Sequence, residues 1–401
     1  MKDTPMGKTE FIALFALLMS LTALTIDAML PALPLIARDL LITDSNDTQL
    51  VISMFILGSV FGEMLFGALS DAYGRRKTVV AGVACYLVGT LIAIFSQSLT
   101  LLLLGRVLQG FGISGSRIGA RALIRDLYRG EQMAQIMSVI MVIFILVPMM
   151  APLLGQVIML QFGWRAIFVA FLIFSVLVLS WFLLRQPETL LPERRIPLSF
   201  SNLFHCLKLI LGHRRVMAYC SVTGLTFGAM LVYLSTSQAM FSDFYQVVDE
   251  FPLYFALLAA GVGASAFINS RIVVRYGMHR VSVWALLGMT AVGLLLLLGT
   301  WFNFGVPPMW LFLSCFMFIL FFMGFIFGNI NAMSMEWLGG MAGIGNSVVG
   351  SLSSLMSVTV AVLVGQLYNA TAYPVVICFT TVALISLALL RYARLSPAVS
   401  L

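Results

Sequence analysis

Residues 67–77, GALSDAYGRRK, decide the fold, because they place a short basic turn between two long apolar runs. The runs cover about residues 48–69 and 78–97. About 20 apolar residues are enough to cross a bilayer as a helix. The segment therefore predicts two membrane helices joined by a tight polar turn.

The composition of the whole chain extends this pattern. The chain has 401 residues, of which 61% are hydrophobic and 10% are charged, whereas a soluble domain carries about 25% charged residues. This excludes a water-soluble enzyme, because lipid has to cover most of the exterior. The formal net charge is +7, but the basic residues are spread over many short loops. They form no continuous stripe, so we expect no nucleic-acid partner.

Twelve apolar runs are long enough to span a membrane. They lie at about 10–33, 48–69, 78–97, 99–120, 133–159, 164–184, 216–241, 251–270, 281–300, 308–330, 341–367 and 373–390. We predict an all-α membrane protein with twelve transmembrane helices in two six-helix bundles, residues 1–185 and 216–401. Residues 186–215, rich in proline and charge, are predicted to be a cytoplasmic linker. Six spans on each side indicate an internal repeat of the kind found in transporters.

The lysines and arginines orient the chain. Most of the 23 lie in loops on one side of the predicted spans, and this side is the cytoplasm by the positive-inside rule. We therefore expect a multi-pass protein of the inner (cytoplasmic) membrane with both termini in the cytoplasm.

The sequence predicts neither a cofactor nor a metal site. The five cysteines are scattered without CxxC spacing, and the three histidines lie in loops without metal-ligand spacing. Gly110-x-Gly112-x-x-Gly115 matches a dinucleotide-binding string but lies inside a span, where small residues serve helix packing. No catalytic constellation follows, so we do not expect an enzyme.

Four charged residues lie well inside the predicted spans: Asp27, Glu63, Arg106 and Arg117. An ionised group at the bilayer centre costs at least ~2.5–3.5 kcal/mol, so each needs a partner or a water-filled cavity. At about 1.5 Å per residue, Asp27 and Arg106 fall roughly 6–9 Å toward the outer face of the membrane. Glu63 and Arg117 fall roughly 7–11 Å toward the inner face. Each pair therefore shares a level in the membrane.

Two interpretations stay open for these charges. Asp27 either ends its helix before Pro31 and Pro34, or lines a cavity as a carboxylate that binds and releases a proton. Glu63 and Arg117 form either a structural ion pair or contacts with the substrate.

Several motifs resemble those of the major facilitator superfamily. Residues 67–77 resemble its signature, Gly-x-Leu-x-Asp-x-x-Gly-Arg-(Arg/Lys). Arg106-x-x-Gln109-Gly110 resembles the drug:proton antiporter signature, and Ala151-Pro152-x-x-Gly155 resembles the antiporter motif with Ala in place of the usual Gly. Residues 27–34, DAMLPALP, resemble the motif that ends span 1 of twelve-span drug exporters.

Further stretches resemble the Bcr/CflA (bicyclomycin-resistance) branch, so the likeness covers essentially the whole chain. These stretches are residues 121–126, 188–194, 269–271 and 331–333 followed by 341–343. Three positions depart from that branch. Glu63 replaces a usual Gln, Arg117 replaces a small or apolar residue, and Ala68 stands where Pro is common.

The resemblance implies a proton-coupled antiporter that exports drugs or metabolites while two bundles rock around a cavity lined by spans 1, 4, 7 and 10. It makes Asp27 the proton acceptor and Arg106 its electrostatic partner. A cytoplasmic gate would comprise Gly67, Asp71, Gly74, Arg75 and Arg76, and the antiporter motif Ala151, Pro152 and Gly155. Besides Glu63 and Arg117, the cavity residues would be Phe227, Tyr233, Gln238, Phe321, Phe325 and Asn329. The aromatic ones among them are equally compatible with simple helix packing.

Two other functions stay open. Arg117 adds a cation that favours an anionic or zwitterionic metabolite such as a siderophore or an amino acid, unless Glu63 neutralises it. A membrane receptor that does not transport would keep the fold without coupling. The expected partners are a small-molecule substrate, protons and the lipid bilayer, and we expect a monomer.

Overall fold

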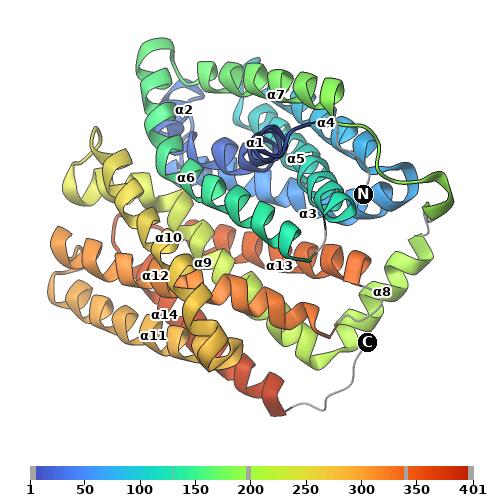
Figure 1. Cartoon of the computed structure of the whole chain (residues 1–401). Helices are drawn as coiled ribbons and strands as arrows, with labels where there is room; N and C mark the ends of the chain where they lie inside the picture. The colour runs from blue at the N-terminus through green and yellow to red at the C-terminus, as the bar shows by residue number, and fades with distance from the viewer. Residues whose placement is uncertain (1–5, 129, 196–199, 338–341, 396–401) are drawn as a thin grey trace. The chain divides into compact units, whose positions relative to one another are not determined.

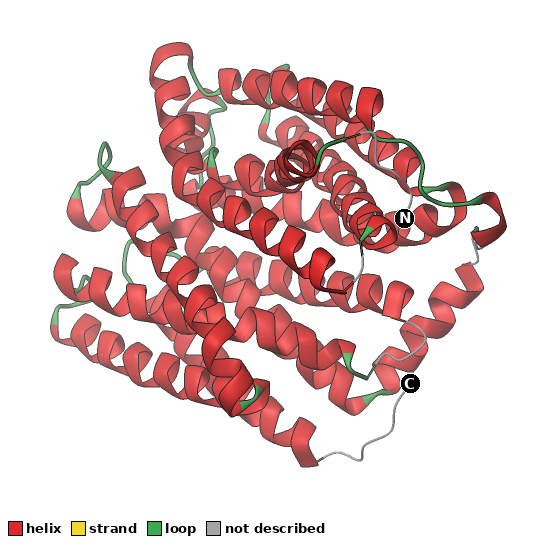
Figure 2. Cartoon of the chain, viewed as in Figure 1, coloured by secondary structure: helices red, strands yellow, loops and turns green. Residues whose placement is uncertain are grey.

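The computed structural model describes residues 6–128, 130–195, 200–337 and 342–395 (Figure 1). The regular structure of these residues consists of α-helices and three short 3-10 helices, without a strand (Figure 2). Pro197 of the predicted linker, Met341 and both ends of the chain lie outside the described residues.

The helices of the described residues include one for each predicted span, together with a short helix after the first span and another inside the predicted linker. In the first half these are α1 (Lys8–Asp27), α2 (Leu33–Asp39), α3 (Leu50–Tyr73), α4 (Arg75–Ile94), α5 (Leu99–Leu127), α6 (Gly130–Phe162) and α7 (Arg165–Arg185), with 3-10 helices η1 (Leu30–Ala32), η2 (Ser45–Gln49) and η3 (Pro192–Arg194). In the second half they are α8 (Phe200–Gly212), α9 (Arg214–Tyr245), α10 (Phe251–Tyr276), α11 (Met278–Phe302), α12 (Met309–Met335), α13 (Ala342–Gly365) and α14 (Tyr373–Leu395).

Eleven helical segments of the described residues are long and apolar enough to cross a membrane, and α6 carries a shorter apolar stretch, Leu146–Phe162. Their outward faces are apolar: Leu104, Leu177 and Leu298 are 59%, 64% and 57% exposed. Such a surface requires lipid instead of water. The prediction of an all-helical membrane protein is confirmed, whereas the number twelve and the two six-helix bundles stay predictions.

The contacts divide the chain into two compact units. The first comprises Met1–Thr43 and Met54–Leu203, and the second Asp44–Ser53 and Phe204–Leu401. In the first unit α4 packs along α5, and α1 packs against α6 (Figure 1). In the second unit α9 packs against α13 and α14, and α11 packs against α12.

The predicted linker, residues 186–215, contains a helix that the composition did not indicate. Helix α8 covers Phe200–Gly212, and Cys206 and Ile210 are buried. These two residues are four apart, so they share one face of the helix. The prolines and charges on which the linker prediction rested lie before this helix, and nothing in the sequence after Pro197 interrupts it.

Glycines with positive φ make the tight turns that begin two helices. Gly74, at φ 112°, separates α3 from α4, and Gly277, at φ 81°, separates α10 from α11. Glycine adopts these angles without a steric penalty. The turn inside residues 67–77 is therefore as short as the sequence predicts.

Candidate functional site

Asp27 is the last residue of α1, and its side chain is buried at 4% exposure. The α-helical hydrogen bonding stops here because Pro31 and Pro34 lack the N–H groups that would continue it. The chain goes on through η1 into α2. Asp27 therefore ends its helix before Pro31 and Pro34, which is one of the two interpretations of its role. This helix end is buried inside the protein. Among the described residues Asp27 has no ion-pair partner within 4.0 Å.

Arg106 of α5 is fully buried and joins α5 to α1. Its Nη2 donates to the carbonyl oxygen of Thr25 at 3.3 Å, two residues before Asp27. Its Nη1 donates to Gln109 Oε1 at 3.0 Å, and its Cζ lies 4.7 Å from the centre of the Phe55 ring. These contacts fix the guanidinium beside the end of α1 that carries Asp27.

Two polar residues of α4, which the sequence analysis did not single out, complete this arrangement. The hydroxyl oxygens of Tyr86 and Thr25 lie 2.8 Å apart, and Gln109 Nε2 donates to Thr90 Oγ1 at 2.8 Å. We call Thr25, Tyr86, Thr90, Arg106 and Gln109 the polar cluster. All five are fully buried, so the cluster ties α1, α4 and α5 together inside the first unit.

The antiporter motif of α6 lies against the end of α1. A Cβ added to Gly155 would lie 2.0 Å from the carbonyl oxygen of Ala28, the residue after Asp27. Only glycine permits this approach of α6 to α1. Ala151 is fully buried, and Pro152 lies inside α6. The motif therefore holds the backbone on which Asp27 sits.

Glu63 and Arg117 form an ion pair between α3 and α5, in which Arg117 Nη2 donates to Glu63 Oε1. The two side chains are 13% and 22% exposed. The helices approach closely at this level, because a Cβ added to Gly62 would lie 2.3 Å from the carbonyl oxygen of Phe111. Arg117 would favour an anionic substrate only if its charge were not neutralised. The ion pair shows that Glu63 neutralises it.

Arg75, one of the residues predicted to form a cytoplasmic gate, contacts Asp71, which is another of them, and the end of α5. Its Nη2 lies 3.0 Å from Asp71 Oδ1, its Nε donates to Asp126 Oδ2 at 3.0 Å, and its Nη1 donates to the carbonyl oxygen of Ser70 at 2.7 Å. Gly67 and Asp71 belong to the last turns of α3, and Gly74 makes the turn. Arg75 therefore holds the α3–α4 turn against the end of α5.

Glu188, at the start of the predicted linker, binds the first turn of α4. Its carboxylate accepts the backbone N–H of Arg75 at 3.0 Å and that of Arg76 at 3.1 Å. It also accepts the N–H groups of Thr189 and Leu190, both at 3.0 Å. An anion is favourable here because the first N–H groups of a helix lack intrahelical acceptors and carry partial positive charge.

The predicted cavity residues of the second half lie on α9 and α12. Tyr233 is buried, with its ring centre 6.0 Å from that of Phe255 and 4.9 Å from that of Phe316. Asn329 is also buried and exchanges two hydrogen bonds with Asn269 of α10, at 2.9 and 3.1 Å.

The remaining predicted cavity residues differ in burial. Phe227 is half-buried with its ring 5.9 Å from that of Phe327, and Phe321 is half-buried with its ring 5.0 Å from that of Phe325. Phe325 and Gln238 are buried. Their part in a substrate cavity stays a prediction.

Several residues of the site could not be recognised from the sequence. Tyr86 and Thr90 are uncharged polar residues within an apolar span, and such residues often bond only to their own helix. Asp126 and Glu188 lie in stretches that resemble the Bcr/CflA branch, but the resemblance assigns neither of them a role. The described residues contain no group of histidine, cysteine, aspartate and glutamate side chains suited to a metal ion.

Comparisons with known proteins agree with this architecture. The family model of the Major Facilitator Superfamily matches residues 14–361. The chain is 31% identical to YdgK of Bacillus subtilis (strain 168), an uncharacterized MFS-type transporter, over 97% of both chains. It is 28% identical to the bicyclomycin resistance protein homolog of Haemophilus influenzae over 95% of both chains. It is 25% identical to multidrug resistance protein D of Escherichia coli (strain K12), over 93% of this chain and 96% of that one.

Solved structures share the fold at low identity. The human organic anion transporter MFSD10 (TETRAN) aligns with a TM-score of 0.72 at 18% identity, over 97% of this chain and 100% of that one. An auto-inhibited peptide transporter of the POT family aligns with a TM-score of 0.75 at 14% identity, over 97% and 98%. The chain belongs to the major facilitator superfamily of membrane transporters, and its relatives are consistent with the Bcr/CflA drug:proton antiporter branch.

Proposed function

We propose that the protein is a proton-coupled antiporter that exports small molecules across the cytoplasmic membrane by alternating access, with both termini in the cytoplasm. The observation that carries the proposal is the burial of Asp27 at an internal helix end, between the close contact of Gly155 and the polar cluster. An intramembrane carboxyl is costly to retain, so its presence favours a functional role.

The surrounding residues give Asp27 a defined setting. The hydrogen bond from Arg106 to the Thr25 carbonyl holds the end of α1 against α5, and the contact of Gly155 holds it against α6. When Asp27 takes up a proton it becomes neutral, and when it releases the proton it leaves a buried negative charge at the end of α1, which Arg106 holds through the Thr25 carbonyl. This change in charge is what would couple the conformation of the site to the proton.

The membrane potential can drive such a cycle without ATP. One elementary charge crossing 100 mV is worth about 2.3 kcal/mol, which supports a substrate gradient of roughly fifty-fold per net proton. In this proposal Arg75, Asp71 and Asp126 keep the cytoplasmic turn of the first unit rigid, so that the helices bearing Asp27 and Arg106 move as one body.

The substrate class follows from the relatives and from the charge balance. Relatives are named for resistance to bicyclomycin and to multiple drugs, so we propose antibiotics of this kind as substrates. The pairing of Glu63 with Arg117 balances the positive charge that Arg117 adds. This removes the reason to prefer an anionic metabolite.

Two measurements test the function. Cells with and without the protein are compared for growth inhibition by bicyclomycin and a panel of other antibiotics, and export raises the inhibitory concentration. Any compound identified in this way is added to vesicles containing the purified protein and a pH-sensitive dye. Antiport predicts proton movement that depends on the compound. Transport without proton movement would refute the coupling, and binding without transport would indicate a receptor.

A further inference from the structure

The second unit contains a pocket of about 520 Å³ at the end of the unit where α9 and α11 begin and where α10, α12 and α14 end. Its size falls in the range of small-molecule sites, about 300–1,000 Å³. All the residues that line it belong to the second unit. It shares no residue with the polar cluster, the gate residues or the predicted substrate cavity.

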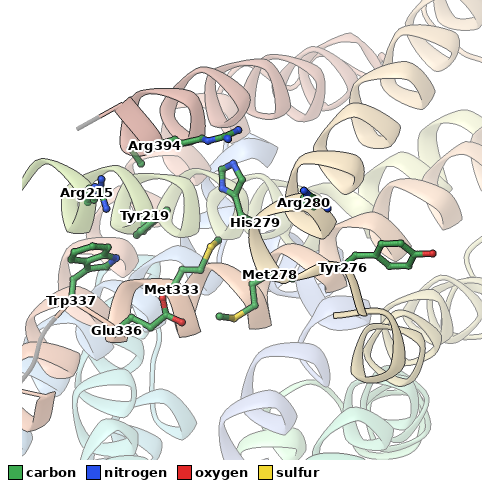
Figure 3. A pocket seen from close by; sticks show the side chains of 12 residues that line it. Arg215, Tyr219, Tyr276, Met278, His279, Arg280, Met333, Glu336, Trp337 and Arg394 are labelled. Atoms are coloured by element: carbon green, nitrogen blue, oxygen red, sulfur yellow. The ribbon is translucent and has the colours of Figure 1, made fainter. Parts of the chain in front are cut away.

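The pocket is strongly basic. Arg215, Arg280 and Arg394 line it together with His279, and Glu336 is the one carboxylate among its described lining residues (Figure 3). The three arginines come from three helices, α9, α11 and α14. Arg280 and Arg394 have no carboxylate partner within 4.0 Å among the described residues. Cationic side chains that line one pocket from separate helices favour an anionic ligand with several oxygens.

Arg215 is held in place by an aromatic neighbour. Its Cζ lies 4.6 Å from the centre of the Trp337 ring, and the buried Tyr219 lies one turn further along α9. Stacking on tryptophan stabilises the guanidinium at this position in the lining. The lining therefore combines cationic groups with an aromatic wall.

An internal comparison indicates which chemistry this end of the unit binds. Gly74 and Gly277 occupy equivalent places in the two halves, each in the turn between the second and third predicted spans. In the first unit the carboxylate of Glu188 accepts the N–H groups of Arg75 and Arg76 at the start of α4. In the second unit the N-cap residue of α11 is Gly277, which has no side chain to cap the helix, and the first three residues of α11 line the basic pocket.

We propose that this pocket binds a phosphate group, which takes the place that the Glu188 carboxylate holds in the first unit. Arg280 and Arg394 bind its oxygens, and Arg215 supplies the third cation. Two sources offer this group: the headgroup of an anionic phospholipid and a soluble phosphate compound of the cytoplasm. Basic pockets between membrane helices on the cytoplasmic side are known to bind such headgroups.

The test uses the full chain purified in a neutral detergent. Its thermal unfolding midpoint is measured with inorganic phosphate, with phosphatidylglycerol and with phosphatidylcholine, all at one ionic strength. Binding to the folded protein raises the midpoint in proportion to occupancy. We expect phosphatidylglycerol or inorganic phosphate to raise the midpoint and phosphatidylcholine to leave it unchanged. A response to phosphate alone identifies a soluble source, and a response to phosphatidylglycerol alone identifies a lipid.

Matched variants locate the binding. Arg280→Gln with Arg394→Gln should weaken the apparent affinity at least about tenfold for each arginine, the usual effect of losing a charge-assisted hydrogen bond. Arg391→Gln, which removes an exposed arginine of α14 outside the pocket lining, should leave it unchanged. Glu336→Gln should tighten binding, because it removes the opposing charge; this variant decides the question if the double variant does not fold.

Three results would overturn the proposal. The first is no stabilisation of the parent protein by either phosphate probe. The second is an equal response to phosphatidylcholine. The third is an affinity that neither the double variant nor Glu336→Gln alters.

Discussion

The ion pair between Glu63 and Arg117 leads to a quantitative prediction, because it can be removed either in part or completely. The side chains are 13% and 22% exposed, so most of each is shielded from water. Removing one partner leaves the other charge buried, which costs about 3–5 kcal/mol for a fully buried pair. The partial exposure lowers the cost of each single variant to just below this range, at about 2.5 kcal/mol.

The double variant should cost less than the two single variants together. Glu63→Gln with Arg117→Ala leaves no charge and matches the residue types that resemble the Bcr/CflA pattern. Its remaining cost, about 2 kcal/mol, comes mainly from the cavity that the shortened Arg117 leaves. The coupling free energy between the two sites should therefore be about 3 kcal/mol.

Equilibrium unfolding in mixed micelles, followed by helix content, measures these values. Arg391→Ala serves as a control on an exposed arginine and should change the free energy of unfolding by less than about 0.5 kcal/mol. Additive single-variant effects, with a coupling below about 0.5 kcal/mol, would refute the buried pair. Drug export by the double variant then separates the two roles. Retained export indicates a structural pair, and lost export in a stable protein indicates a substrate contact.

Three further substitutions test the contacts around the site. Gly155→Val should destabilise the protein by about 1–3 kcal/mol and reduce transport, because its Cβ would lie 2.0 Å from the Ala28 carbonyl oxygen; normal stability and transport would show that α6 does not approach α1 so closely. Glu188→Gln should lower the free energy of unfolding by about 1 kcal/mol, because a neutral amide binds the N-terminal N–H groups of α4 more weakly than a carboxylate; an effect that does not shrink at high salt would contradict this electrostatic origin. Tyr86→Phe should cost about 1 kcal/mol by removing the hydroxyl that lies 2.8 Å from Thr25 Oγ1; an unchanged unfolding curve would argue against the polar cluster.

The helices were predictable because each depends on a single property of its own segment. A run of about 20 apolar residues has to become a helix in lipid, since no other open structure satisfies its backbone. The sequence analysis did not predict α8, because proline and charge before Pro197 dominated the composition of the linker. Composition averages over a segment, whereas Cys206 and Ile210 show their shared face only at helical spacing.

The sequence indicated candidate site residues of the first unit mainly where they carry a charge. Asp27, Arg106, Glu63 and Arg117 stand out because ionised groups are costly in a membrane. Tyr86 and Thr90 gave no such signal, and their contacts with Thr25 and Gln109 depend on how three helices pack. The partners of Arg106 were likewise set by packing. Asp27 and Arg106 were predicted to lie at the same depth in the membrane, but equal depth does not decide which atoms form a hydrogen bond. In the structure Arg106 donates to the carbonyl oxygen of Thr25.

The most direct test of the account is the proton movement that a transported antibiotic causes in vesicles containing the Asp27→Asn protein. Asparagine keeps the shape of the side chain and cannot exchange a proton, so we predict that compound-dependent proton movement disappears while the compound still binds. The Glu63→Gln, Arg117→Ala double variant, which also lacks one intramembrane carboxylate, should retain proton movement. Full coupled flux through the Asp27→Asn protein would contradict the assignment of Asp27 as the coupling residue.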